Sequence, residues 1–283
     1  MLSIIICSRT QTLNKDLSEN IENTVGSEHE LIVVDNSENG YSIFEAYNLG
    51  IERSKGDFLC FIHDDILFYT NGWGNTIQYI FSLEEQIGLI GIAGTKTKTR
   101  MPSTWWDCPE DQKVMNIIQH FSNGEIKKQQ FGFGNASLQA VVAIDGVFMA
   151  MRKDNRIRFS NDMEGFHNYD LNISFEYIKN GYKIMVTNEI LIEHFSIGSL
   201  DEAWVVSGYK IHNLYKDFLP VAIKVNMGDK KTEGINAIRF IDKCLTYKQN
   251  KKAFSTWKAF FLIHPISVYH YTFFKRIIKN YLC

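Results

Sequence analysis

Short runs of apolar residues alternate with longer segments of mixed polarity through the first third of the chain. The apolar runs lie at 3–7, 30–35, 58–62 and 87–93. They are rich in Ile, Leu, Val and Phe, which is typical of strands buried on both faces. The segments between them have the length and pattern of helices, and they lie at 14–25, 43–53 and 72–86. This alternation predicts βαβ units and an α/β fold with a mostly parallel sheet.

The remainder of the chain divides into two parts. Residues 95–138 lack a regular period, and we expect them to form a long excursion over the site. A helix at 171–180 is expected to end at Gly181. The later strand-like runs lie at 141–151, 182–186 and 190–192. Helical segments follow at 200–218, 233–247, 251–264 and 266–281. These patterns predict a large domain over 1–220 and a helical extension over 221–283.

Charge separates the same two parts. The net charge is −2, but residues 221–283 contain twelve Lys/Arg and three Asp/Glu, a balance of +9 that leaves −11 for the first 220 residues. Eight large aromatic residues are interleaved with the basic ones between 251 and 279. This composition suits peripheral contact with an anionic membrane. It equally suits a subdomain that packs its aromatics against the large domain or a second subunit, and we favour that alternative because eight aromatics can form a core.

Cysteine usage and hydropathy indicate the compartment. The five cysteines are scattered and include no CxxC pair, which argues against a disulfide framework and a structural zinc site. No secretory signal and no apolar stretch of membrane-spanning length is evident. We expect a reducing, cytoplasmic location, with contact at the inner face of a membrane as the alternative.

Acidic residues follow two of the predicted strands. Asp35 ends one strand, and His63-Asp64-Asp65 follows the next. Because strand carboxyl ends of an α/β sheet face one crevice, both groups are candidates for a ligand site. The adjacent carboxylates repel each other unless a cation, such as one carried by a diphosphate, joins them. The alternatives are a helix N-cap for the Asp64-Asp65 pair and an Asx turn for Asp35.

Three further features are candidates for chemistry. Asp170 precedes a predicted helix, so it is either a general base or the N-cap of the helix from Leu171, and the two roles are compatible. His194 ends a strand, where an imidazole can bind a metal or phosphate or make a structural hydrogen bond. Of the pair Trp105-Trp106, we expect one ring to pack inside and the other to be exposed.

Six segments, in order, resemble the inverting family-2 glycosyltransferases of the GT-A fold. They are Ser3-Ile4-Ile5-Ile6-Cys7-Ser8-Arg9, Ile32-Val33-Val34-Asp35-Asn36-Ser37, Ala46-Tyr47-Asn48-Leu49-Gly50-Ile51 with Lys55-Gly56-Asp57, Phe61-Ile62-His63-Asp64-Asp65, Tyr169-Asp170-Leu171-Asn172-Ile173 with Lys179-Asn180-Gly181-Tyr182, and His194. The resemblance covers residues 1 to about 200. It implies a mixed, mostly parallel sheet flanked by helices.

The resemblance also implies roles. The donor, a nucleoside-diphosphate sugar that we expect to be UDP-linked, would contact Ser8, Arg9, Asp35, Asn48 and Asp64. Mn²⁺ or Mg²⁺ would lie on Asp65, His194 and His63. Asp170 would be the base of an inverting single displacement onto a hydroxyl of a glycan or lipid-linked acceptor, in bacterial cell-surface polysaccharide synthesis. A homo-oligomer is possible in such a family, whereas a nucleic-acid partner is not expected.

Two positions depart from the family pattern. His63 replaces the first carboxylate of the family's DxD motif, and Tyr169 replaces the first acid of the pair that includes Asp170. Members of a related bacterial subfamily share the His-x-Asp form. The competing functions are a nucleotidyltransferase, which would need a glycine-rich loop where Cys7-Ser8-Arg9 lies, and a non-catalytic nucleotide-sugar-binding protein.

Overall fold

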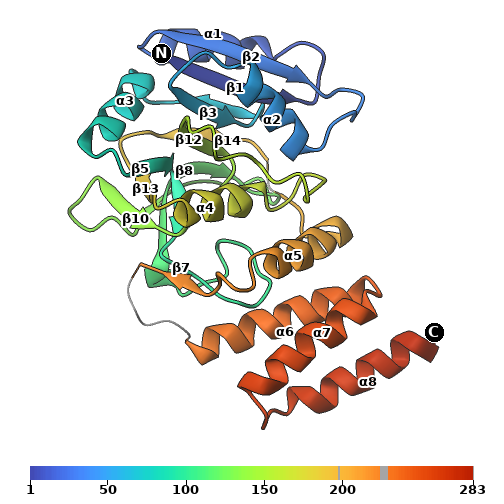
Figure 1. The fold of residues 1–283 in the computed structure, drawn as a ribbon. Coiled ribbons are helices and arrows are strands. Elements are labelled where there is room, and N and C mark those ends of the chain that lie inside the picture. Colours follow the sequence, from blue (N-terminus) through green and yellow to red (C-terminus); the bar gives the residue numbers. More distant parts are fainter. Residues whose placement is uncertain (197, 224–228, 283) are drawn as a thin grey trace.

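The computed structural model describes residues 1–196, 198–223 and 229–282, and it places the sheets at one end and the C-terminal helices at the other (Figure 1). The main sheet has seven strands in the order β10-β13-β5-β12-β3-β1-β2. Their bounds are β1 (Leu2–Ser8), β2 (His29–Asp35), β3 (Phe58–Ile62), β5 (Ile87–Gly91), β10 (Leu138–Val141), β12 (Phe148–Arg152) and β13 (Lys183–Thr187).

Strand direction confirms a mixed, mostly parallel sheet. β1 runs parallel to β2 and β3, β5 runs parallel to β13, and β12 runs antiparallel to both β3 and β5. Five strands therefore point one way, while β10 and β12 point the other way. The carboxyl ends of β1, β2 and β3 meet at one edge, where Ser8 lies opposite Asp35.

Alternating side chains of the central strands bury both faces of this sheet. Ile4 and Ile6 of β1 pack in one cluster with α1 (Lys15–Thr24) and α3 (Trp73–Leu83). Ile5, between them, packs in the opposite cluster with α2 (Ile43–Arg53) and α4 (Tyr169–Lys179). A Cβ at Gly50 of α2 would lie 2.3 Å from Ile5 Cγ2, so this helix approaches the sheet only because the residue is glycine.

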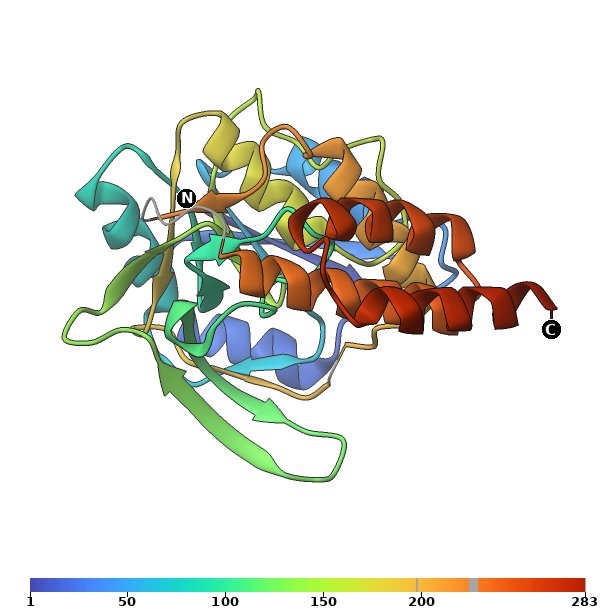
Figure 2. The same cartoon turned by 90° about the horizontal axis from the view of Figure 1, so that it is seen from below.

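A second, six-stranded sheet lies beside the first and includes part of the segment that was expected to be irregular. Its strands are β4 (Ile66–Phe68), β6 (Ala93–Thr95), β8 (Lys113–His120), β9 (Ile126–Phe131), β11 (Ala143–Ile144) and β14 (Ile192–His194). The expectation of an irregular 95–138 is therefore wrong for 113–131, where β8 and β9 form a hairpin that extends from the body (Figure 2). Its β9 strand is mostly polar and exposed, so it lacks the alternating apolar pattern that marks a strand.

The C-terminal part is helical, as predicted. It contains α5 (Glu202–Leu214), α6 (Lys230–Thr246), α7 (Asn250–Ile263) and α8 (Tyr269–Leu282), and the short strand β15 (Val221–Ala222) pairs with β7 (Thr97–Lys98). A third apolar cluster joins these helices through Phe240, Phe260 and Phe273, and it includes Trp204 of α5 and Met101. No helix among the described residues has the length and apolar character needed to cross a bilayer.

Candidate active site

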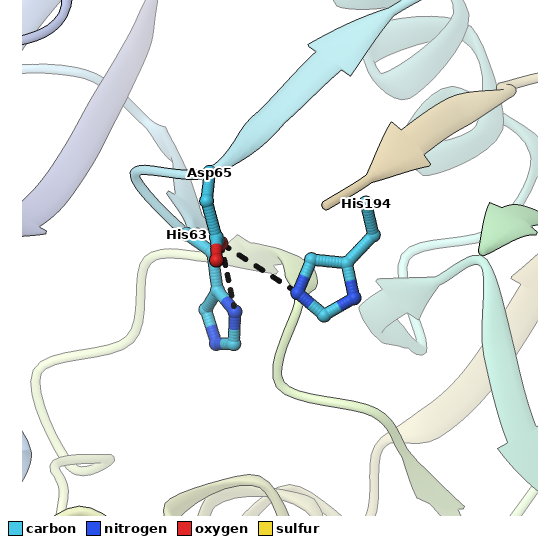
Figure 3. A group of neighbouring side chains, drawn as sticks. All are labelled: His63, Asp65 and His194. Atoms are coloured by element: carbon cyan, nitrogen blue, oxygen red, sulfur yellow. Dashed lines mark ion pairs between the residues drawn. The ribbon is translucent and has the colours of Figure 1, made fainter. Parts of the chain in front are cut away.

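The three predicted metal ligands converge at the meeting point of the two sheets. Asp65 Oδ1 lies 3.8 Å from His63 Nδ1 and 3.6 Å from His194 Nε2. One ligand atom from each of the three side chains falls within 4.8 Å of the others (Figure 3). An imidazole–carboxylate–imidazole set with this spacing can hold a divalent transition metal.

Strand pairing explains why residues so far apart in sequence meet. β4 starts directly after Asp65 and runs antiparallel to β14, with Ile66 opposite His194. The backbone N–H of Phe195 donates to the carbonyl oxygen of Asp65 at 3.1 Å. On the other side, the N–H of His63 donates to the carbonyl of Val147 at 3.2 Å, which ties the end of β3 to the start of β12.

His194 has the hydrogen-bonding arrangement of a metal ligand. Its Nδ1 lies 3.0 Å from the side-chain oxygen of Gln119, which acts only as an acceptor. Nδ1 therefore carries the proton, and Nε2 presents its lone pair toward Asp65. Nε2 is buried and has no hydrogen-bond partner among the residues that the structure describes. An orphaned buried nitrogen facing a carboxylate fits a metal site better than a structural hydrogen bond.

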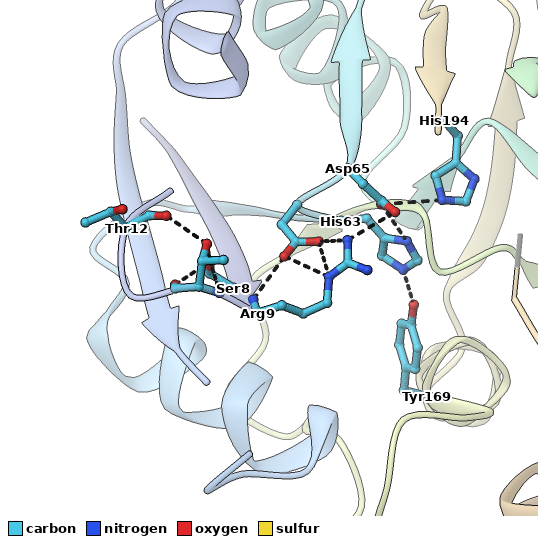
Figure 4. A network of polar contacts seen from close by, with 9 residues as sticks. Ser8, Arg9, Thr12, His63, Asp65, Tyr169 and His194 are labelled. Atoms are coloured by element: carbon cyan, nitrogen blue, oxygen red, sulfur yellow. Dashed lines mark hydrogen bonds and ion pairs between the residues drawn. The ribbon is translucent and has the colours of Figure 1, made fainter. Parts of the chain in front are cut away.

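His63 is fixed by a residue from the other half of the chain. Its Nε2 lies 2.5 Å from the phenol oxygen of Tyr169 (Figure 4). Burial, together with the neighbouring His194 imidazole, lowers the pKa of His63 below its ordinary value. The neutral ring can donate from Nε2 to the phenol oxygen, which leaves the Nδ1 lone pair directed at Asp65. Tyr169 approaches so closely because residue 146 is glycine: a Cβ there would lie 2.3 Å from the phenol oxygen.

The positive group that joins the two adjacent carboxylates in this structure is Arg9. Its guanidinium lies 3.2 Å from Asp65 (Figure 4). The same guanidinium lies 2.6 Å from Asp64, and the backbone N–H of Arg9 also donates to Asp64 at 3.0 Å. Asp64 therefore pairs with Arg9 and lies outside the imidazole cluster.

Asp170 lies in a cavity of about 210 Å³ that is also lined by both histidines, and it is not the N-cap of its helix. Asn168 occupies the cap position, and Asp170 belongs to the first turn of α4. Its Oδ1 accepts a hydrogen bond from the N–H of Leu171 at 2.8 Å. Burial, and then the charge of Asp145, raise the pKa of Asp170 to about 7. A carboxylate with a near-neutral pKa is matched to proton transfer at physiological pH.

Asp145 is a site residue that the sequence analysis passed over. It lies between β11 and β12 and lines the same cavity as Asp170. Its Oδ2 accepts a hydrogen bond from Trp105 Nε1 at 2.7 Å, and its Oδ1 accepts one from the N–H of Val147 at 2.8 Å. The available signal was the Asp-Gly pair that interrupts an apolar strand, because a polar break inside a buried run points to a functional turn.

Three predicted donor contacts lie apart from this cluster. Ser8 is buried, and its hydroxyl donates to the carbonyl of Thr10 at 2.8 Å. Asp35 is exposed beside it, and its carboxylate accepts a hydrogen bond from the N–H of Ser37 at 3.0 Å, the Asx-turn alternative. The amide of Asn48 both donates to and accepts from the backbone of Phe159, at 2.8 and 3.0 Å, so it holds two segments together.

The tryptophan pair divides as expected. Trp105 is 3% exposed and Trp106 is 40% exposed at the rim of the Asp170 cavity. Phe166, 47% exposed, lies on the same rim. A larger cavity of about 560 Å³ lies between β7, β15 and the start of α6, but none of the predicted site residues lines it.

Comparisons with known proteins agree with this fold. The family described as glycosyltransferase-like matches residues 3–220. A Fuscovulum blasticum protein described as "ATP synthase subunits region ORF 6" is 26% identical over 155 residues, which are 53% of this chain and 57% of that protein. The match thus spans little more than half of that relative's length.

Two solved structures share the architecture at low sequence identity. S. aureus TarS 1-349, crystallised with UDP-GlcNAc, is 11% identical with a TM-score of 0.54, over 99% of this chain and 89% of that one. GalNAc-T7, crystallised with UDP, GalNAc and Mn²⁺, is 10% identical with a TM-score of 0.50, over 77% of this chain and 50% of that one. The family match over most of the chain and the shared architecture lead to one conclusion: this protein belongs to the glycosyltransferase-like family and has the GT-A fold.

Proposed function

We propose that this protein transfers a sugar from a nucleoside-diphosphate sugar to a hydroxyl acceptor, with inversion at the anomeric carbon. The observation that carries the proposal is the shared cavity of Asp170 and the two histidines. A carboxylate with a pKa of about 7 lies beside a set of side chains suited to a divalent cation. A base and an electrostatic stabiliser of a leaving diphosphate are the two groups that this reaction needs.

His63, Asp65 and His194 are the residues that would hold Mn²⁺ or Mg²⁺. A bound divalent cation would neutralise charge on the leaving diphosphate. The two imidazoles favour Mn²⁺ over Mg²⁺, because Mg²⁺ prefers oxygen ligands. The orphaned His194 nitrogen supports this assignment, and so does the Mn²⁺ in the GalNAc-T7 crystals.

The donor would lie along the carboxyl ends of β1, β2 and β3. Asp35 is exposed there and can accept hydrogen bonds from a ribose or base, and Ser8 and Asn48 shape the adjoining backbone. The Arg9 side chain is 69% exposed, so its guanidinium can turn from Asp64 to a phosphate oxygen. The UDP ligands of both structural neighbours support a uridine donor.

Asp170 would act as the base. As the acceptor oxygen attacks the anomeric carbon, its proton moves to Asp170, and the bond from that carbon to the phosphate oxygen breaks. The electron pair of the broken bond leaves with the nucleoside diphosphate, which balances the step. Asp145 would act through its charge, which keeps the pKa of Asp170 near neutral.

The acceptor would enter at the rim of this cavity. The exposed rings of Trp106 and Phe166 provide apolar surface against which a sugar can pack. A glycan or a lipid-linked sugar fits such a rim as the acceptor. The biological role that we propose is bacterial cell-surface polysaccharide synthesis at the cytoplasmic side of the membrane. A nucleotidyltransferase fits less well because the β1 loop lacks a glycine-rich phosphate cradle.

The test is release of nucleoside diphosphate from a panel of UDP-, GDP- and dTDP-sugars with Mn²⁺ and a mixture of acceptors. We expect one donor to be turned over by the wild type and at least a hundredfold more slowly by Asp170→Asn, with donor binding retained. Near-normal turnover by Asp170→Asn would show that Asp170 is not the base. Donor binding without turnover, in both proteins and with every acceptor, would favour the non-catalytic alternative.

A further inference from the structure

The paired helices α7 and α8 have two apolar sides, and only one of them is covered. Phe260 and Phe273 are 2% and 0% exposed and belong to the C-terminal core. The residues that follow them, Phe261 and Phe274, are each 42% exposed on the other side. The predicted packed subdomain therefore accounts for Phe260 and Phe273, whereas Phe261 and Phe274 are not part of that core.

The outer aromatics form one patch around Trp257. The rings of Phe254, Phe261 and Phe274 lie 5.5, 5.7 and 4.9 Å from the Trp257 ring, measured between centroids. Because α7 and α8 each contribute to these contacts, the patch is continuous across both helices. Ile278, one helical turn beyond Phe274, is 55% exposed and extends it along α8.

The end of α7, the start of α8 and the turn between them form a segment that is more exposed still. We call its four apolar side chains the α7–α8 tip: Leu262, Ile266, Val268 and Tyr271 are 82%, 98%, 92% and 76% exposed. The tip lies at the end of the molecule farthest from the main sheet, and α8 projects past the rest of the body (Figures 1 and 2). Apolar side chains on a projecting turn can enter an apolar environment outside the protein, such as a lipid layer, without any rearrangement of the fold.

The ionised side chains that α7, α8 and their connection contribute to this surface are all basic. From Lys243 to Cys283 the sequence has eight Lys/Arg and no Asp/Glu. The ammonium of Lys258 lies 4.9 Å from the centroid of the Phe254 ring, at the edge of the patch. The exposed lysines of the two helices, which we call the flanking lysines, are Lys251, Lys258, Lys275 and Lys279.

We propose that the α7–α8 tip and the flanking lysines bind the surface of an anionic lipid bilayer. Apolar side chains at the tip would enter the boundary of headgroups and acyl chains, while the lysines contact lipid phosphates. A second copy of the same face is disfavoured, because it would oppose two surfaces on which positive charge predominates. The proposal does not depend on sugar transfer, since it concerns a surface outside the Asp170 cavity.

The experiment is co-sedimentation of the full chain with vesicles of phosphatidylcholine alone or with 30% phosphatidylglycerol. We expect binding to the anionic vesicles at least tenfold tighter than to the neutral ones, and a loss of most of it in 0.5 M NaCl. Equal affinity for both vesicles, or no sedimentation with either, would overturn the proposal.

Two sets of substitutions separate the apolar and charged contributions. Replacing the four tip residues by Ser should weaken binding at least tenfold, and replacing the flanking lysines by Gln should weaken it about fivefold per lysine. Both sets change exposed side chains, so the melting temperature should stay within about 2 °C. The matched controls change exposed residues elsewhere: Tyr79, Leu83 and Ile126 to Ser, and Lys15, Lys55, Lys127 and Lys128 to Gln.

The controls should bind like the wild type. If the tip variant binds vesicles as tightly as the wild type, the tip is not the contact. If the wild type is a dimer without lipid and the tip variant is a monomer by size-exclusion chromatography with light scattering, this face is a subunit interface and the lipid proposal is wrong.

Discussion

The Nε2 atom of His63 lies 2.5 Å from the phenol oxygen of Tyr169, although 106 residues separate them in sequence. These are the two positions at which the chain departs from the pattern of the family that it resembles. His63 replaces the first carboxylate of the family's DxD motif, near the metal site. Tyr169 replaces the acid that usually precedes the base, which is Asp170 here. Because the replacements contact each other, we interpret them as one coupled change that orients His63 toward Asp65.

Removing the Tyr169 hydroxyl should weaken the metal site. Tyr169→Phe leaves His63 Nε2 without its partner, and loss of a partner that orients a metal-bound histidine costs about tenfold to a hundredfold in metal affinity. Titration of Mn²⁺ by calorimetry measures the change. Tyr47→Phe is the matched control, because the Tyr47 hydroxyl is buried and unpartnered among the described residues. Equal Mn²⁺ affinity in Tyr169→Phe and Tyr47→Phe would mean that the phenol does not orient His63.

Asp170→Asn should stabilise the fold at alkaline pH. The folded-state pKa of about 7 lies above the ordinary 3.8, so between these values the folded protein holds a proton that the unfolded chain has lost. The contribution of Asp170 to wild-type stability therefore falls as pH rises from about 4 to 7, and the variant lacks this loss. Urea unfolding at pH 8 should show a gain of about 2–4 kcal/mol, which shrinks at pH 5. Asp217→Asn, at an exposed position, is the control, and a destabilised Asp170→Asn at pH 8 would contradict the account.

Asp145→Asn should shift the pH dependence of transfer. After burial, the Asp145 charge is the largest cause that raises the pKa of Asp170. The acidic limb of kcat/KM, expected near pH 7 in the wild type, should therefore move to lower pH in the variant. Loss of the acceptor for Trp105 Nε1 will also cost about 1–3 kcal/mol of stability. Trp105→Phe separates the two effects, because it removes the hydrogen bond and keeps the Asp145 charge. If the acidic limb of kcat/KM lies at the same pH in Asp145→Asn as in the wild type, the proposed coupling is wrong.

The sequence predicts what depends on local pattern. The apolar runs that contain Ile5 and Phe61 are predicted to be strands, because burial on both faces leaves an unbroken apolar stretch. Asp65 and His194 are candidate site residues, because polar side chains at strand ends face ligands. The structure brings both together, and it confirms that Trp105 packs while Trp106 is exposed.

What the sequence left open depends on contacts between distant segments. No local pattern shows that Asn48 would pair with the backbone of Phe159, or that Arg9 would reach Asp64. The helix that contains Asp170 starts at an Asn168 cap with φ of +63°, a left-handed conformation that a search for ordinary caps does not anticipate. The influence of Asp145 on Asp170 likewise appears only when β11, β12 and α4 are in place.

Nucleotide binding with and without a divalent cation tests the central claim most directly. Thermal unfolding should be followed with UDP, GDP and dTDP, each alone and with Mn²⁺, for the wild type and Asp65→Asn. We predict that one nucleoside diphosphate at a hundredfold excess over its Kd raises the wild-type Tm by about 4–6 °C only with Mn²⁺, and that Asp65→Asn loses this rise. If no nucleoside diphosphate or its sugar stabilises the wild type with Mn²⁺ or Mg²⁺, the proposed function is wrong.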